Sequence, residues 1–394
     1  MTAMHVPVLV VGGGIGGLST ALAIARTGRE VHLVEQAAEF GEIGAGLQVG
    51  PNATRILDRL GLLDAVLAVS VLPRHGVMRD AITTEQLTVL DLGEAFRRRY
   101  GYPYIVVHRH DLLSLLVEAC RAEPLLTLET DRTVVDVHSH ADGAGVRCAD
   151  GTEYTTDLLV GADGLHSRVR TLVSADEPVC SGFVAYRGTL PMDEVRADVA
   201  AVDDVVLWVG PGLHLIQYPV RRGEVYNQVA VFRSDRLVRG ETPFGTPEEL
   251  DARFARACPQ VRSHVGRISR ERTWPIYDRD PLPTWISGRA VLLGDAAHPM
   301  LQYLGQGACQ ALEDAWTLAA ELDRFGSETD KALAAYQERR LPKASRCQVS
   351  ARPWGEVWHT ESPAMLGLRR RALGARRPDD YTELDWLYAE DLAS

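Results

Sequence analysis

The stretch VLVVGGGIGG, residues 8–17, decides the fold. Its first half, Val8 to Val11, is a short apolar run of the kind that a parallel sheet buries, and the Ala/Leu-rich segment from Leu18 to Thr27 has helical character. Glycines at GxGxxG spacing lie between the two, where they permit a tight turn, close approach of a pyrophosphate to the backbone and close packing of the helix. These glycines are Gly12, Gly14 and Gly17.

A second predicted strand, Val31 to Glu35, follows this helix, and Gly28 is expected to cap the helix C-terminus. Glu35 lies 23 residues after Gly12, where an acidic side chain can accept hydrogen bonds from a ribose diol. The segment therefore predicts a doubly wound β-turn-α-β unit whose helix N-terminus holds the anionic part of a dinucleotide. This pattern alone does not distinguish FAD from NAD.

The rest of the chain alternates between two kinds of pattern. Residues 109–120 have helical apolar spacing, whereas 127–137 and 145–160 are strand-like and return the chain to the first sheet. From 182 to 232, strand-like runs separated by GPG and RRGE turns predict an antiparallel meander. The elements expected after it are a polar helix near 246–257, a buried strand at 290–293 and a helix at 307–322.

Composition excludes several classes of function. The 394 residues include 53 acidic and 42 basic side chains, and a net charge of -11 disfavours binding to nucleic acid. Six scattered cysteines without a CxxC pair suggest neither a disulfide framework nor a metal site, and they fit a reducing cytoplasm. The apolar N-terminal stretch lacks a basic flank and is interrupted by five glycines, so we expect neither a signal peptide nor a transmembrane segment.

Two later segments resemble motifs of the FAD-dependent aromatic hydroxylases. DLLVGADGLHSRVR, residues 157–170, resembles the family's DG motif and places Asp163 and Gly164 in it. GDAAHPMLQYLGQG, residues 294–307, resembles the GD motif, in which the Asp295 position contacts the flavin-side ribose. Physically, a strand end, an acid and a Gly-rich helix start can hold a diol and polarise a flavin carbonyl. Further cofactor-binding candidates are Arg109, which matches a flavin-contacting arginine, and Gln48, Gly305 and Gly307.

The resemblance implies an enzyme that uses FAD as cofactor, NADH or NADPH as co-substrate and dioxygen, without a separate NAD(P)H-binding domain. It implies an α/β fold with a doubly wound, Rossmann-like FAD-binding domain, an inserted antiparallel-sheet substrate domain and a C-terminal helical tail. The expected ranges are 1–75, 100–178 and 268–350 for the FAD-binding domain, 76–99 and 179–267 for the substrate domain, and 351–394 for the tail.

Four further segments resemble one group in this family, the 3-hydroxybenzoate 6-hydroxylases, which make gentisate. The start of the helix expected at 307–322, with the sequence LGQGACQ at 304–310, follows a broader salicylate-type pattern instead. The leading expectation is therefore para-hydroxylation of 3-hydroxybenzoate through a flavin C4a-hydroperoxide. The four segments are GEIGAGLQVGPNA at 41–53, RDAIT at 79–83, LHLIQYPV at 213–220 and HPMLQYL at 298–304.

Hydroxylation of a phenol requires a base, because a phenolate attacks an electrophilic oxygen far better than a phenol does. Histidine suits this role without tuning of its pKa. His214 and Tyr218 are four residues apart on a predicted strand and face the same side, which covers the flavin in the resembling family. His214 is expected to deprotonate the substrate, Tyr218 to bond or stack with it, and Gln302 to orient the phenol oxygen. Weaker substrate-pocket candidates are Leu47 and Tyr104.

Other functions remain open at this stage. Within the enzymes, these are a salicylate-type decarboxylating hydroxylase and a tailoring hydroxylase of a larger phenol. Outside them are a flavin dehydrogenase or reductase without oxygen insertion and a flavin-binding protein without catalysis. No arginine can be assigned to a substrate carboxylate by spacing alone. The favoured interpretation of the basic LRRRALGARR segment in the tail is a solvated face, and a lipid contact is an alternative. The tail itself is either a docking helix or a homodimer contact through Trp354, Trp358 and Trp386.

Overall fold

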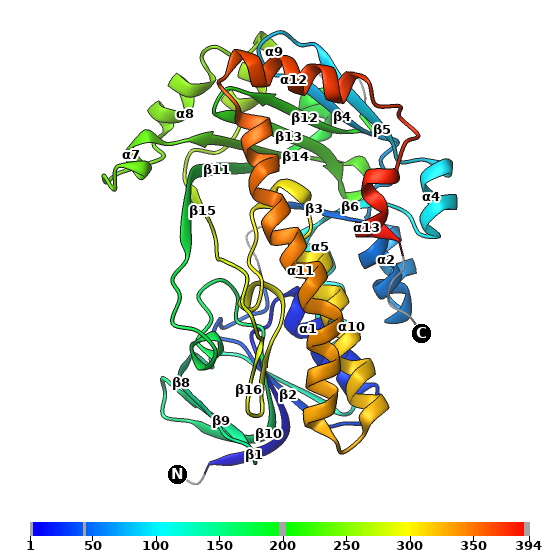
Figure 1. The fold of residues 1–394 in the computed structure, drawn as a ribbon, viewed down its shortest axis with the longest axis vertical. Coiled ribbons are helices and arrows are strands. Elements are labelled where there is room, and N and C mark those ends of the chain that lie inside the picture. Colours follow the sequence, from blue (N-terminus) through cyan, green and yellow to red (C-terminus); the bar gives the residue numbers. More distant parts are fainter. Residues whose placement is uncertain (1–2, 42–44, 197–201, 390–394) are drawn as a thin grey trace.

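The computed structural model of the chain describes residues 3–41, 45–196 and 202–389, and it places two sheets at opposite ends of the molecule (Figure 1). The first sheet contains the dinucleotide-binding segment. Its central strands run in the order β16-β17-β10-β1-β2-β7, and the pairs from β17 to β7 are parallel. Its strands are β1 Met4–Val11, β2 Val31–Val34, β7 Leu126–Glu129, β8 Val134–Ser139, β9 Ala144–Cys148, β10 Glu153–Gly161, β16 Ile286–Ser287 and β17 Ala290–Leu292.

The predicted β-turn-α-β unit is confirmed, with small shifts at its ends. Helix α1 spans Ile15–Ala25 and begins three residues earlier than expected, directly after the extended N-cap Gly14. Gly28 lies just beyond the helix in a left-handed conformation at φ 87°, but the C-cap position itself is Arg26. Nearly every residue of α1 is buried because the helix packs between the sheet and α10, Gly307–Phe325.

The second sheet has the order β15-β11-β14-β13-β12-β4-β5. Its strands are antiparallel except for β12 and β4, which run parallel, so the predicted meander covers β12 to β14 and then joins strands from distant parts of the chain. Its strands are β4 His75–Asp80, β5 Gln86–Asp91, β11 Val179–Pro191, β12 Val205–Gly210, β13 Leu213–Val220, β14 Val225–Arg233 and β15 Trp274–Asp278.

The two faces of this sheet have different roles. One face packs against α8, Pro247–Phe254, and α9, Pro259–Gly266, through a core that includes Leu213 and Leu215. Helix α8 lies where the sequence predicts a polar helix, and it begins at a capping box between Thr246 and Glu249. The alternate residues of β13, beginning with His214, face the first sheet instead.

The structure departs from the expected ranges in two places. Strand β15 lies within 268–350 but pairs with β11, so it belongs to the second sheet. Helix α11, Thr329–His359, is continuous across the expected start of the tail at residue 351. The expected strands at 127–137 and 145–160 are each divided in two, because a turn at Asp131, with φ 57°, and a hairpin turn at Gly151, with φ 85°, interrupt them.

Helix α11 runs from the first sheet to the second, and the chain then crosses the far side as α12, Pro363–Gly374, before returning as α13, Asp385–Tyr388 (Figure 1). In the described ranges, none of the helices is long and apolar enough to cross a membrane. The other strands are β3 Gly46–Val49 and β6 Ile105–His108, which form a two-stranded sheet between the larger two. The other helices are α2 Pro51–Arg59, α3 Leu63–Val69, α4 Glu94–Tyr100, α5 Arg109–Ala122, α6 Met192–Val195 and α7 Asp235–Val238.

Candidate active site

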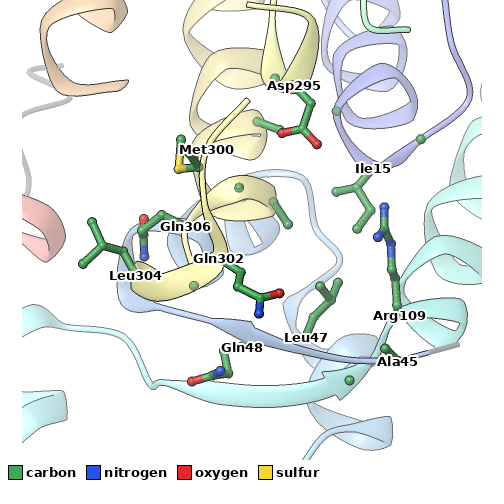
Figure 2. Close-up of a pocket in the computed structure, with 18 of the residues that line it drawn as sticks. Ile15, Ala45, Leu47, Gln48, Arg109, Asp295, Met300, Gln302, Leu304 and Gln306 are labelled. Atoms are coloured by element: carbon green, nitrogen blue, oxygen red, sulfur yellow. The ribbon is translucent and has the colours of Figure 1, made fainter. Parts of the chain in front are cut away.

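A cavity of about 770 Å³ lies between the two sheets and is lined by residues from both. Its volume is suited to a cofactor or a small ligand. Figure 2 shows Asp295, Arg109 and Gln302 pointing into this space from three different elements, above the strand that carries Leu47 and Gln48. Fifteen of the sixteen predicted site residues line it: Gly12, Gly14, Glu35, Leu47, Gln48, Tyr104, Arg109, Asp163, Gly164, His214, Tyr218, Asp295, Gln302, Gly305 and Gly307.

The glycine turn forms one end of the cavity. Gly12 has φ 109°, and a Cβ atom there would collide with the carbonyl of Ala162. Gly17 is the one predicted residue that does not line the cavity, because it packs directly against Gly12, which is the helix-packing role expected of the third glycine. Gly14 faces open space, so its backbone is accessible to a pyrophosphate at the N-terminus of α1.

Glu35 closes this end at the position expected for a ribose partner. Its Oε2 accepts a hydrogen bond of 2.5 Å from the backbone N–H of Gly13, and its Oε1 accepts one of 2.9 Å from Ala37. These bonds hold the carboxylate at the edge of the cavity next to the glycine turn. The residues present therefore fit the adenosine half of a dinucleotide.

The DG segment connects the two parts of the cofactor end. Asp163 accepts a hydrogen bond of 2.5 Å from the Ser167 hydroxyl; burial raises its pKa, and this bond partly offsets that shift. The buried Arg170 donates to the carbonyls of Ala296 and Ala297 at 2.8 and 2.9 Å. The arginine of the DG motif thus fixes the GD segment in place.

The GD segment forms the other half of the cofactor end. Asp295 lies in the 3-10 turn η4, Gly294–Ala296, and its side chain is exposed to the cavity. Gly305 has φ 62° and ends a second 3-10 turn, η5, Gln302–Leu304, just before α10 begins at Gly307. The α10 N-terminus opens on the cavity, where its unpaired N–H groups can polarise a carbonyl of a flavin.

Arg109 begins α5 on the opposite wall of the cavity from Asp295 (Figure 2). Burial lowers its pKa, and the charge of Asp295 partly offsets that shift. A guanidinium and a carboxylate that face the same space from two elements can bind the polar edge and the ribityl hydroxyls of one flavin. The donor set therefore fits FAD.

The second sheet supplies the inner end of the cavity. His214 and Tyr218 lie on the cavity face of β13, and both are buried, with exposed fractions of 1% and 3%. The Tyr218 ring packs closely on Gly46 of β3, where a Cβ atom would collide with it. Tyr104 donates a hydrogen bond of 2.6 Å to Oε1 of Gln48, which joins a substrate-pocket candidate to a cofactor-binding candidate.

A second histidine, which the sequence did not single out, completes this end. His359 is the last residue of α11, and its Nε2 lies 2.7 Å from Nδ1 of His214. The two rings are stacked at 5.0 Å, and Trp358 meets the His214 ring edge-on at 5.3 Å. Burial lowers the pKa of His214 well below its usual value and that of His359 to about 3, with Arg369 contributing to the second shift.

Two residues from the same segments lie outside the chemistry. Gln217 points to the opposite face of the sheet, where it bonds to Trp208 and Gln228. His298 is buried and bonds to Asp314 at 2.5 Å, in keeping with the structural role of the turn that contains it. Part of the GEIGAGLQVGPNA segment, residues 42–44, lies outside the described residues.

One cavity that begins at a dinucleotide turn and ends at a buried histidine is suited to an oxidoreductase that holds a flavin against a small organic substrate. Comparisons with known proteins agree with this class. A family model described as "FAD binding domain" matches residues 5–350. The chain is 38% identical over 380 residues to a 3-hydroxybenzoate 6-hydroxylase of Klebsiella oxytoca, covering 96% of each protein. It is 35% identical to the 3-amino-4-hydroxybenzoate 2-monooxygenase PtmB3 of Streptomyces platensis, covering 98% of this chain and 96% of that protein.

Solved structures give the same result. HpxO of Klebsiella pneumoniae with FAD and uric acid superposes with a TM-score of 0.82 at 26% identity, over 95% of this chain and 93% of that one. A salicylate hydroxylase substrate complex gives 0.80 at 27% identity, over 99% and 96%. The chain belongs to the family of FAD-dependent aromatic hydroxylases. It is a flavoprotein monooxygenase that takes FAD as cofactor, with NAD(P)H and dioxygen as co-substrates, and the expected fold class is confirmed.

Proposed function

We propose that this enzyme hydroxylates a phenolic aromatic acid, and that its substrate is 3-hydroxybenzoate, with gentisate as the product. The observation that carries the proposal is a buried, hydrogen-bonded histidine at the inner end of the FAD cavity. The resemblance of the whole chain to 3-hydroxybenzoate 6-hydroxylases supports the choice of substrate. A decarboxylating action on salicylate is the second candidate, because the structure of a salicylate hydroxylase is also similar.

In this proposal, His214 is the general base for the phenol. Its Nδ1 is occupied by His359, so its Nε2 is the nitrogen available to the substrate. When the shared proton is on Nδ1, Nε2 carries a lone pair and can accept the phenol proton. Burial favours neutral His214, which keeps this lone pair available at neutral pH.

The other roles follow from position in the cavity. Gln302 enters from η5, and its amide can donate to the phenol oxygen while His214 removes the proton. Tyr218 packs on β3 between the base and the cofactor end and presents its ring and hydroxyl to the substrate. Bound FAD supplies the redox chemistry, passing electrons from NAD(P)H to dioxygen and one oxygen atom to the ring.

The experiment measures NADH oxidation by the purified holoenzyme in the presence of 3-hydroxybenzoate, salicylate or 4-hydroxybenzoate, with the products identified by chromatography. Gentisate formed from 3-hydroxybenzoate is the expected result. Carbon dioxide released from salicylate would favour the second candidate. If none of the three acids stimulates oxidation, the substrate is a larger or differently substituted phenol, and the proposed substrate is wrong.

We also propose a cytoplasmic location. All six cysteines are free thiols, and five of them are buried. A chain without disulfides is suited to a reducing compartment.

Of the three tail tryptophans considered for a dimer contact, Trp358 packs inside this chain and Trp386 stacks on Arg346 at 4.0 Å. A homodimer through the tail would therefore depend on Trp354, which is 37% exposed.

A further inference from the structure

The cavity face of the second sheet carries one charge on β11. Arg187 is the only charged residue of that strand. It lies two residues after Ala185, so both side chains are on the same face of the strand, the face toward the cavity. In the sheet register it stands opposite Val229 of β14, which stands opposite Ile216 of β13, and all three line the cavity. The guanidinium therefore shares a wall with the proposed catalytic base.

This guanidinium has no protein anion to neutralise it. Within the part of the chain that the structure describes, Arg187 makes no hydrogen bond or ion pair, and its Nε is buried without a partner. Its close polarisable neighbour is the ring of Trp274, 5.5 Å from the guanidinium carbon. Burial lowers the pKa of Arg187, and a buried charge without a counter-charge is costly. Such a residue is suited to an anion that arrives with a ligand.

The other arginines of the cavity are placed at the cofactor end or in solvent. Arg132 is paired with Glu129 and Asp150, and Arg376 donates to the carbonyl of Asp380. Arg168 is exposed beside the DG segment, and Arg109 faces Asp295. The phosphates of a dinucleotide belong at the glycine turn, at the far end of the cavity from β11. The anion for Arg187 is therefore a group of the substrate.

We propose that Arg187 binds the carboxylate of the aromatic substrate, an assignment that rests on the proposed function. A planar guanidinium binds a carboxylate through two parallel hydrogen bonds, which fixes the orientation of the acid as well as its position. Strand β11 lies two strands from β13, roughly 10 Å at the usual spacing, so Arg187 and His214 contact different edges of the ring.

This placement agrees with the chemistry of para-hydroxylation. When oxygen is added para to the phenol oxygen of 3-hydroxybenzoate, the reacting carbon is the neighbour of the carboxyl-bearing carbon. The phenol oxygen then points away from the flavin, toward His214, and the carboxylate lies on the flavin side. Arg187 lines the same cavity as Arg109 of the cofactor end, and its charge contributes to the lowered pKa of Arg109. Tyr218, which also lines the cavity, interacts electrostatically with Arg187.

The test compares an acid with its neutral amide. Binding of 3-hydroxybenzoate and of 3-hydroxybenzamide to the oxidised holoenzyme is followed by the change that each causes in the flavin absorption spectrum. In Arg187→Gln, we expect affinity for the acid to fall by about thirtyfold or more and affinity for the amide to change within about threefold. Arg187→Lys, which keeps the charge and loses the two-bond geometry, is expected to give an intermediate loss.

Arg79→Gln is the matched control. Arg79 lies on β4 of the same sheet but stacks on Trp208 and does not line the cavity, so its removal should leave the affinity for the acid and the affinity for the amide both unchanged. FAD content of each variant confirms that the fold is intact.

Two results overturn the proposal: an equal loss for acid and amide in Arg187→Gln, or acid binding that survives the substitution. Turnover separates this proposal from the proposed function. If the wild-type enzyme binds the acid better than the amide and Arg187→Gln abolishes that preference, the carboxylate site is supported even if 3-hydroxybenzoate is not hydroxylated. In that case, the substrate is another phenolic acid.

Discussion

At the scale of single residues, His214 combines two properties that a general base for a phenol needs. It is buried at the inner end of the cavity, and its Nδ1 is fixed by a hydrogen bond of 2.7 Å to His359. A fixed Nδ1 determines the ring orientation, so in the proposed mechanism Nε2 meets the substrate without a search through rotamers. Gln302 and Tyr218 then have only to place the phenol oxygen near that nitrogen.

The substitution His214→Ala should leave FAD bound and reduce hydroxylation by about a hundredfold or more, the usual contribution of a general base. The measurement is kcat/KM from product formation, together with the flavin content of the purified variant. His140→Ala, at an exposed position in the turn between β8 and β9 and outside the cavity, is the control and should keep full activity. Full activity in His214→Ala would rule out the role as base.

The pH dependence of the reaction follows from the direction of the His214 shift. Burial, with a contribution from His359, lowers its pKa well below 6.5, so the free enzyme keeps the base unprotonated at and below pH 6.5. Protonation removes the base only once the pH falls through the lowered pKa. We therefore expect kcat/KM for hydroxylation to stay level from pH 8 to below pH 6.5. An acidic limb with its midpoint at or above 6.5 in a pH profile of initial rates would contradict this assignment.

We propose that Asp295 binds the cofactor, so its removal should affect binding of FAD before it affects catalysis. The carboxylate is exposed to the cavity, where it can accept hydrogen bonds from a hydroxyl pair of the flavin chain. In Asp295→Ala, we expect the dissociation constant for FAD to rise by about tenfold or more, as for loss of a charged hydrogen bond. Fluorescence titration of the apoprotein with FAD measures it. Asp323→Ala, exposed near the end of α10, should bind FAD normally.

At the scale of elements, the sequence predicts what local patterns determine. Strands β1 and β2, helix α1 and the glycine turn are close in the chain, and the turn alone requires a glycine at φ 109° and another where helix and strand touch. The helix starts at Arg109 and Gly307 were predicted at the right residue because a charged or Gly-rich turn marks each of them.

Pairings between distant segments could not be predicted in the same way. The parallel contact of β12 with β4 and the addition of β15 beside β11 depend on how the whole chain packs, since no spacing in either segment indicates its neighbour. His359 is 145 residues from His214, and only the path of α11 brings them together. Arg187 had one local signal, a single charge in the apolar run FVAYRGTL, but its function depends on which face of β11 lines the cavity.

In the proposed mechanism, helix α11 contributes to the chemistry as well as to the fold, and substitution of His359 tests that contribution. In His359→Ala, we expect kcat to fall by roughly tenfold or more, because His214 loses the bond that orients its ring, while KM and FAD content change little. His359→Gln retains an amide oxygen that can accept from Nδ1 and should recover part of the activity. A loss of FAD or an equal fall in both variants would mean that His359 supports the fold alone.

At the scale of the whole molecule, a buried charged cluster joins α10, whose N-terminus opens on the cofactor end of the cavity, to α11, which reaches the second sheet. Arg340 of α11 donates to Glu313 at 2.6 Å and to Asp314 at 2.8 Å, both on α10. Asp314 also accepts from His298 and from the backbone N–H of Gly294, the residue before Asp295. Burial alone would raise the pKa of Asp314, but the charges of His298 and Arg340 lower it to about 2.

Arg340→Met should therefore destabilise the holoenzyme by about 3–5 kcal/mol, because it leaves two buried carboxylates without their shared cation. Chemical unfolding followed by circular dichroism measures the loss. The control, Arg324→Met, removes an arginine that is 67% exposed and pairs with Glu321 at 3.4 Å, so it should cost no more than about 1 kcal/mol.

The same cluster makes stability depend on pH. In the wild type, the lowered pKa of Asp314 means that its contribution to the free energy of unfolding is present above the unfolded value near 3.8 and is lost as the pH falls toward 2. In Arg340→Met, the carboxylates take up protons more readily. The difference in unfolding free energy between the variant and the wild type should therefore shrink as the pH is lowered from 8 to 5. A deficit that is independent of pH would show that Arg340 acts through packing instead of charge.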